Sequence, residues 1–80
     1  MNITILFFGV TTDLVGKNSL IYTLDGKTTI EALKKKLKTT YPSLKNIHEF
    51  AIAVNEEYAN DDLTINENDV IAIIPPVSGG

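Results

Sequence analysis

Cysteine is absent from the 80 residues of this chain, and histidine occurs once, at His48. Without cysteine the chain has no disulfide bond, no thiolate metal site and no cysteine nucleophile. One histidine cannot build a histidine metal cluster, and we expect His48 to be a surface residue of a loop. The sequence therefore predicts neither a metal site nor a catalytic centre made of these residue types.

Long hydrophobic stretches are also missing. No apolar run approaches the roughly 18 to 20 residues that a membrane-spanning helix needs. The first residues, 1–5, lack the charged region and the cleavage site of a signal peptide. We therefore expect a cytoplasmic protein.

Positive charge is scarce. Lysine and arginine together number 7, against 10 aspartate and glutamate residues, which gives a formal net charge of -3. This balance weighs against nucleic acid as a partner, because such binding needs a clustered basic surface. The lysines at 34–36 and 38 favour a solvated helix face over a docking site for an acidic partner. The acidic run at 56–69 lacks the spacing of an EF-hand calcium loop, so we expect a solvated rim there.

The residues that are present predict one small α+β domain. Hydrophobic residues make up 44% of the chain, which suffices for a packed core at the small end of domain sizes. Runs rich in β-branched and aromatic residues predict strands at residues 2–9, 19–24, 50–55, 58–59 and 70–74. Residues 10–18 are expected to form a loop with at most a short turn, and residues 43–49 an irregular segment.

A single long helix is predicted at residues 28–40. Its apolar stripe has spacings of three and four residues and consists of Ile30, Leu33 and Leu37. Thr28 and Glu31 fit the capping-box pattern at its start, and Thr29 is the alternative N-cap.

The order of these elements predicts a mixed sheet that holds the helix, an α+β roll. We expect the last strand to lie beside the first one, in parallel. In the first strand, alternation predicts a core face made of Ile3, Ile5 and Phe7. Leu63 and Ile65 are expected to anchor the acidic segment to this core.

The C-terminal end is the most informative segment. We divide the chain into a folded domain, residues 1–74, and an extended tail, residues 75–80, which reads Pro75-Pro76-Val77-Ser78-Gly79-Gly80. The prolines keep the backbone extended, and six residues reach roughly 20 Å. The glycines have no side chains and fit a channel only a backbone wide. This shape predicts that the Gly80 carboxylate enters the active site of another protein.

Several short motifs occur along the chain in order. They are Ile5-Leu6-Phe7-Phe8, Asp13-Leu14-Val15-Gly16, Thr29-Ile30-Glu31-Ala32-Leu33, Ala53-Val54-Asn55, Asn68-Asp69-Val70 and the terminal hexapeptide. With these motifs the chain resembles the small subunits of molybdopterin synthase, a family of ubiquitin-like sulfur-carrier proteins with the β-grasp fold. The hexapeptide is the most specific motif. Where the family often has a glycine, this chain has Asn68, and asparagine adopts the left-handed conformation readily.

The resemblance implies a chemical cycle at Gly80. An enzyme similar to ubiquitin-activating enzymes adenylates the Gly80 carboxylate with ATP, and a sulfur donor converts it to a thiocarboxylate. The tail then enters the large synthase subunit, where the sulfur is delivered to cyclic pyranopterin monophosphate. Two transfers build the dithiolene of molybdopterin. The resemblance also implies a 2+2 heterotetramer in which the large subunit supplies the catalytic side chains, Gly79 gives clearance, and this chain binds no cofactor.

Strand alternation predicts where the partners dock. Leu6 and Phe8 share the strand face that Thr4 marks as outward, and we expect Ile74, rather than Ile73, to add to the same patch. An apolar patch at the root of the tail suits a protein partner. The predicted partner-binding residues, for the activating enzyme and the large subunit alike, are Leu6, Phe8, Ile74, Pro75, Pro76, Val77 and Ser78.

Other functions remain open at this point. The related carriers for thiamine thiazole synthesis are usually shorter and end in Gly-Gly without the double proline. A ubiquitin-like protein modifier would use the same adenylate but form an isopeptide bond with a lysine. An interaction module with an inert tail is the third alternative.

Overall fold

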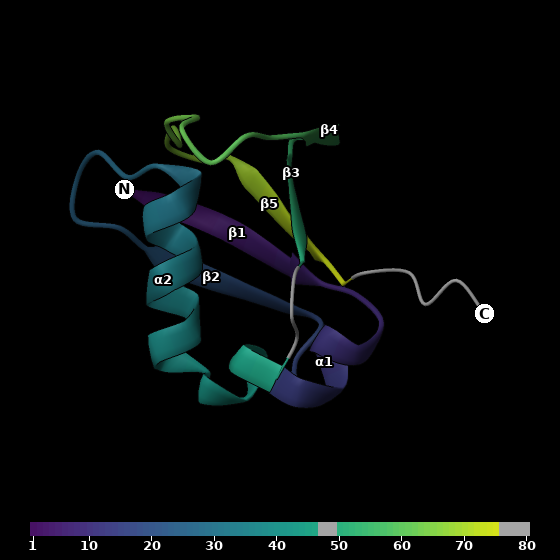
Figure 1. Ribbon diagram of the computed structural model, residues 1–80. Coiled ribbons are helices and arrows are strands. Elements are labelled where there is room, and N and C mark those ends of the chain that lie inside the picture. Colours follow the sequence, from purple (N-terminus) through teal and green to yellow (C-terminus); the bar gives the residue numbers. More distant parts are fainter. Residues whose placement is uncertain (47–49, 76–80) are drawn as a thin grey trace.

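The computed structural model describes residues 1–46 and 50–75 as an α+β fold with one main helix (Figure 1). The strands are β1 (Asn2–Phe7), β2 (Ser19–Thr23), β3 (Ala51–Val54), β4 (Glu57–Tyr58) and β5 (Val70–Ile74). The helices are α1 (Val10–Val15), α2 (Ile30–Thr40) and the 3₁₀ helix η1 (Pro42–Asn46). Within the described residues, no helix combines the length and the hydrophobicity that crossing a membrane requires.

The five strands form one mixed sheet in the order β2-β1-β5-β3-β4. The first and last strands, β1 and β5, pair in parallel at its centre, as predicted, and the other pairs are antiparallel. Helix α2 lies across one face of this sheet (Figure 1). The sheet therefore has a covered face and an outer face.

The covered face carries the core. Alternate residues of β1 point inward as predicted, and they meet the buried residues of β5 and the apolar stripe of α2. The fully or almost fully buried members of this cluster include Ile3, Ile5, Phe7, Ile30, Leu33, Leu37, Ile71 and Ile73. Strand β5 has a neighbouring strand on each side, β1 and β3. Pro75 therefore follows a strand that is paired on both edges.

The prediction of a loop at residues 10–18 was wrong, because residues 10–15 form α1. Two threonine hydroxyls at the start of α1 bond to the end of β1: Thr11 Oγ1 donates to the Phe8 carbonyl, and Thr12 Oγ1 donates to the Phe7 carbonyl at 3.0 Å. Gly16 then ends the helix in the left-handed conformation, with φ of 81°. A six-residue helix fixed by such contacts has too short an apolar pattern to be found by periodicity.

The start of α2 also differs from its prediction. Thr29, the alternative N-cap, holds this position, and its hydroxyl oxygen accepts a hydrogen bond from the Ala32 amide at 3.3 Å. Thr28 instead donates to the Gly26 carbonyl at 3.1 Å, within the preceding turn. The third helical residue is therefore Ala32 and not Glu31, so the capping box is not formed.

Three strands were predicted one or two residues too long at an end, and the strand predicted at 58–59 was shifted by one residue. The strands expected at 2–9, 19–24, 50–55 and 58–59 are Asn2–Phe7, Ser19–Thr23, Ala51–Val54 and Glu57–Tyr58. Part of the irregular segment expected at 43–49 belongs to η1, while residues 47–49, and with them His48, lie outside the described residues.

The acidic segment is anchored by one of the two expected side chains. Ile65 is 2% exposed, as predicted, but Leu63 is 44% exposed. The backbone of Leu63 is held instead of its side chain, because its carbonyl accepts a hydrogen bond from the Ile30 amide at 3.0 Å.

Candidate functional site at the root of the C-terminal tail

Strand β5 ends at Ile74, and Pro75 follows it directly. Proline has no amide hydrogen, so it cannot continue the ladder with a neighbouring strand. The predicted reacting residue Gly80 and its neighbours Pro76, Val77, Ser78 and Gly79 lie outside the described residues. Their roles stay predictions, and the described site is the root from which they continue.

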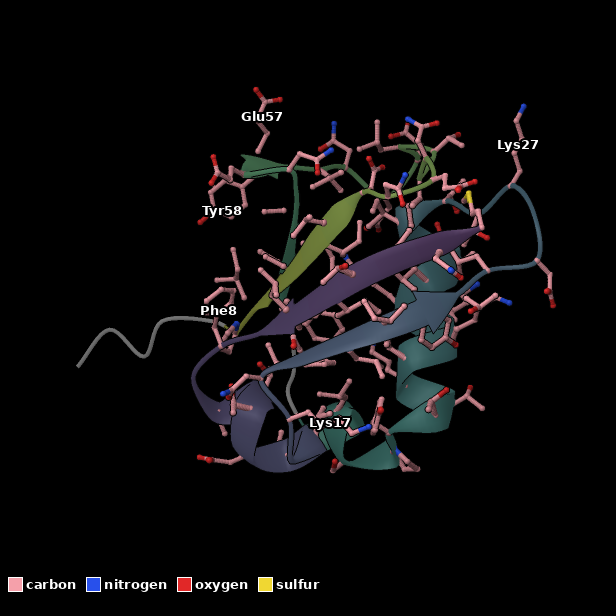
Figure 2. The ribbon with its side chains drawn as sticks, turned by 180° about the vertical axis from the view of Figure 1, so that it is seen from behind. Phe8, Lys17, Lys27, Glu57 and Tyr58 are labelled. Atoms are coloured by element: carbon pink, nitrogen blue, oxygen red, sulfur yellow. The ribbon has the colours of Figure 1, made fainter. Side chains whose placement is uncertain are left out.

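The end of β1 contributes Phe8 to this root. Figure 2 views the sheet from the side away from α2, and Phe8 lies there beside the end of β5. Its side chain is 49% exposed. A phenylalanine that the protein's own loops leave half uncovered is an apolar surface that a partner can bury.

The register of β1 and β5 brings Ile74 to the same place. Phe7 pairs with Ile73 in the parallel ladder, so Phe8, directly after β1, and Ile74, the last residue of β5, follow this pair on the outer face. Ile73 is fully buried and Ile74 is half-buried. The structure thus places Ile74, and not Ile73, on the outer face, as predicted.

Leu6, two residues before Phe8, belongs to the same group. It pairs with Ala72 and is half-buried on the outer face. Pro75 is half-buried as well. We call Leu6, Phe8, Ile74 and Pro75 the tail-root patch.

The apolar outer face extends further than the sequence reasoning predicted. Ile21 and Val70 both pair with Thr4, and Tyr58 pairs with Ala53, so these residues share the outer face. Ile21 is 66% exposed and Tyr58 is 77% exposed. The signal for Ile21 was available, because alternation in the strand predicted at residues 19–24 puts Ile21 on the face opposite to Leu20 and Tyr22.

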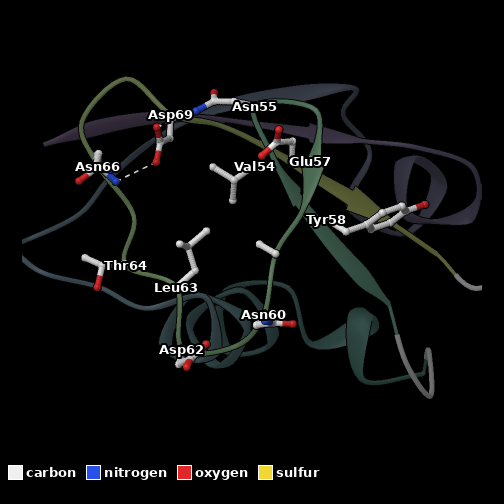
Figure 3. A pocket seen from close by; sticks show the side chains of 11 residues that line it. Val54, Asn55, Glu57, Tyr58, Asn60, Asp62, Leu63, Thr64, Asn66 and Asp69 are labelled. Atoms are coloured by element: carbon white, nitrogen blue, oxygen red, sulfur yellow. Dashed lines mark hydrogen bonds between the residues drawn. The ribbon is translucent and has the colours of Figure 1, made fainter.

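A second surface feature lies beside the start of β5, at the opposite end of that strand from Pro75. It is an open pocket of about 560 Å³ between β4 and the loop that precedes β5 (Figure 3). The carboxylate of Asp69, which lines this pocket, accepts hydrogen bonds from the Asn66 amide at 2.8 Å and from Asn55 Nδ2 at 2.9 Å. Asn55 Oδ1 in turn accepts from the Val70 amide at 3.0 Å. These bonds hold the loops together, so we assign Asp69 a structural role.

Three lysines of α2 have local partners. Lys34 pairs with Asp61 at 2.7 Å, and Lys35 lies 3.3 Å from Glu31. Lys38 lies over the ring of Phe50, with its Nζ 5.6 Å from the ring centre. Among the residues that the structure describes, no group of three or more acidic or histidine side chains is arranged to hold a metal ion.

Fold and site together define a class of protein. A mixed five-stranded sheet that holds one main helix, with its central last strand followed by the segment Pro75 to Gly80, is typical of a ubiquitin-like β-grasp carrier. Within this class the chain belongs to the ThiS family, whose model matches residues 5–80.

The relatives in sequence share one description. A protein from Dictyostelium discoideum named molybdopterin synthase sulfur carrier subunit is 44% identical over 80 residues, covering 95% of this chain and 93% of its own length. A protein of the same name from Caenorhabditis elegans is 37% identical and covers 100% of this chain and 99% of its own length. The similarity therefore extends over the whole domain and the tail.

Solved structures agree on the fold. The SAMP1 crystal structure from Haloferax volcanii superposes with a TM-score of 0.86 and 100% coverage of both chains, at 21% identity, which shows the fold alone. A complex of subunits 1 and 2 of molybdopterin-converting factor from Helicobacter pylori contains a chain that is 26% identical, with a TM-score of 0.70 and 100% coverage of both chains.

Proposed function

We propose that this chain is the sulfur-carrier subunit of molybdopterin synthase and that Gly80 is its reacting residue. The observation that carries the proposal is the full-length similarity to proteins of that name, which reaches 44% identity. The chain donates sulfur and is not the catalyst, since the reacting group is the end of its own backbone.

The chemistry of the terminal carboxylate explains the steps. A carboxylate is a poor electrophile at neutral pH, so it must be activated before a nucleophile can attack it. ATP converts it to an acyl-adenylate with release of pyrophosphate, in an activating enzyme related to those of ubiquitin. A sulfur donor then displaces AMP and leaves a thiocarboxylate on Gly80.

The thiocarboxylate is the form that delivers sulfur. The tail enters the large synthase subunit, where the sulfur passes to cyclic pyranopterin monophosphate, and two such transfers make the dithiolene of molybdopterin. Gly79 and Gly80 carry no side chains, so a narrow channel suffices for them. The assembly that we propose contains two copies of each subunit.

The tail-root patch is the proposed docking surface. Its exposed member Phe8 and its half-buried members Leu6 and Ile74 gather where the chain leaves β5. A partner that buries this patch also holds the start of the tail at a fixed position. The Helicobacter pylori complex of subunits 1 and 2 supports a direct partner of the large-subunit kind.

One experiment tests the first half of the cycle. The purified chain is incubated with ATP, a sulfur donor and the cognate activating enzyme, and the intact chain is weighed. We expect a mass gain equal to the difference between one sulfur and one oxygen atom, located at Gly80. A ladder of larger conjugates would instead indicate a protein modifier, and an unchanged mass would indicate an inert tail.

A second experiment tests the destination of the sulfur. The thiocarboxylated chain is mixed with the large synthase subunit and cyclic pyranopterin monophosphate, and molybdopterin is measured together with the return of the chain to its carboxylate mass. Product formation supports the proposal. Sulfur delivery to a thiazole-forming system, with none to the pterin, would favour a carrier for thiamine synthesis.

A further inference from the structure

The connection between β1 and α1 contains a glycine that touches the root of the tail. Gly9 has φ of 55° and ψ of -134°, a backbone conformation that residues with a side chain rarely adopt. A Cβ atom added to Gly9 would lie 3.2 Å from Pro75 Cγ. That distance is tighter than most Cβ contacts, so a side chain at Gly9 would require the proline ring to move by a few tenths of an ångström.

The strand register explains why these two residues meet. Phe7 pairs with Ile73 in the parallel ladder. Gly9 and Pro75 each lie two residues beyond this last pair, just after the ends of β1 and β5. The ladder does not extend to these residues, because Pro75 has no amide hydrogen to donate. The contact between Gly9 and the proline ring takes the place of the next backbone pair.

The position of Gly9 is itself well defined. On one side, the Phe8 amide donates to Thr11 Oγ1 at 3.0 Å, and the Thr11 amide donates to the Phe8 carbonyl at 3.1 Å. On the other side, the Gly9 carbonyl accepts from the Thr12 amide at 3.1 Å. Thr11 is fully buried. A rigid Gly9 is therefore a fixed support for the proline ring.

We infer that Gly9 is a positioning residue for the tail: its bare backbone seats Pro75 and fixes where the chain leaves the sheet. This inference rests on the proposed function, because it matters only if the tail must enter an active site. The residue acts through Pro75 and touches no reacting atom. A side chain at position 9 would shift the proline ring by a few tenths of an ångström and displace the start of the tail.

The test is a double-mutant cycle of Gly9→Ala and Pro75→Ala, with the rate of thiocarboxylate formation on Gly80 as the readout. Gly9→Ala is expected to lower this rate about tenfold, since a displaced tail root misplaces the Gly80 carboxylate in the activating enzyme. In the Pro75→Ala background, which removes Cγ, the same Gly9→Ala change is expected to have little effect. An equal loss of rate in both backgrounds would overturn the inference.

A second glycine controls for the general effect of placing alanine at a positive φ. Gly16 also has a positive φ, of 81°, but nothing lies within 4 Å of a Cβ added there. Gly16→Ala should lower the free energy of unfolding while the rate of thiocarboxylate formation stays at the wild-type value. If Gly16→Ala slows the reaction as much as Gly9→Ala does, strain and not the proline contact is responsible, and the inference fails.

A measurement without any enzyme keeps the inference separate from the proposed function. The backbone amide resonance of Ile74, the residue before Pro75, should shift in Gly9→Ala and stay in place in Gly16→Ala. If the wild-type chain is not thiocarboxylated, the proposed function fails, and the Ile74 resonance still decides whether Gly9 seats Pro75. An unmoved Ile74 resonance in Gly9→Ala would contradict the contact.

Discussion

At the scale of single residues, Phe8 is where the proposed docking is most open to test. We expect Phe8→Ala to weaken binding to the large synthase subunit by about 2 kcal/mol, as is typical for a central aromatic contact in an interface. Affinity is measured by titration calorimetry with the purified partner. Unchanged affinity would remove Phe8 from the interface.

Leu63 provides the control for this substitution. It is 44% exposed, close to the 49% of Phe8, but it lies on the loop that precedes β5, away from the tail root. Leu63→Ala should leave the partner affinity unchanged. The free energy of unfolding is measured for both variants, so that a loss of binding is not confused with a loss of folded protein.

Residues with a positive φ differ in whether the sequence indicates that conformation. Asn68 has φ of 69°, and the sequence indicated this, because asparagine there replaces a glycine of the related family. Asn55 and Glu56 also have positive φ, of 50° and 74°. Glutamate gives no such signal, because the tight connection between β3 and β4 imposes its conformation.

At the scale of elements, the N-cap of α2 gives a prediction about the free energy of unfolding. Thr29→Ala removes the hydroxyl that accepts from the Ala32 amide, and we expect a loss of about 1 kcal/mol in the free energy of unfolding. Glu31→Ala should change it by less than about 0.5 kcal/mol, since Glu31 makes only an exposed pair with Lys35. Urea denaturation followed by circular dichroism measures both. A larger loss for Glu31→Ala than for Thr29→Ala would contradict this and support the capping box predicted from the sequence.

The elements that could be predicted are those with a strong hydrophobic period. The stripe of α2 and the alternation of β1 gave the core and the outer face because burial on one side only imposes that pattern. Helix α1 was missed because contacts of Thr11 and Thr12 with β1, rather than an apolar period, hold it in place. The seating of Pro75 on Gly9 was missed for a related reason, since it depends on a strand register that the sequence does not specify.

At the scale of the whole molecule, the core and the proposed reacting residue lie in different parts of the chain. The buried hydrophobic residues of the described structure run from Ile3 to Ile73, and β5 ends at Ile74. The central parallel pair of β1 and β5 could be foreseen from the order of strands and helix. The extent of the outer face to Tyr58 could not, because it depends on how β4 pairs with β3.

This division predicts the effect of shortening the chain. Removal of Gly80 alone, or of residues 76–80, should leave the free energy of unfolding within about 0.5 kcal/mol of the wild-type value, as for changes outside the core. Both truncations should abolish the mass gain at the C-terminus, since the activated carboxylate is then misplaced. Urea denaturation measures the free energy of unfolding, and intact-mass measurement on the same samples detects the mass gain. A truncation that unfolds the domain would show that the tail contributes to the fold, and a Gly80 deletion that still gains sulfur would show that the reaction does not require Gly80.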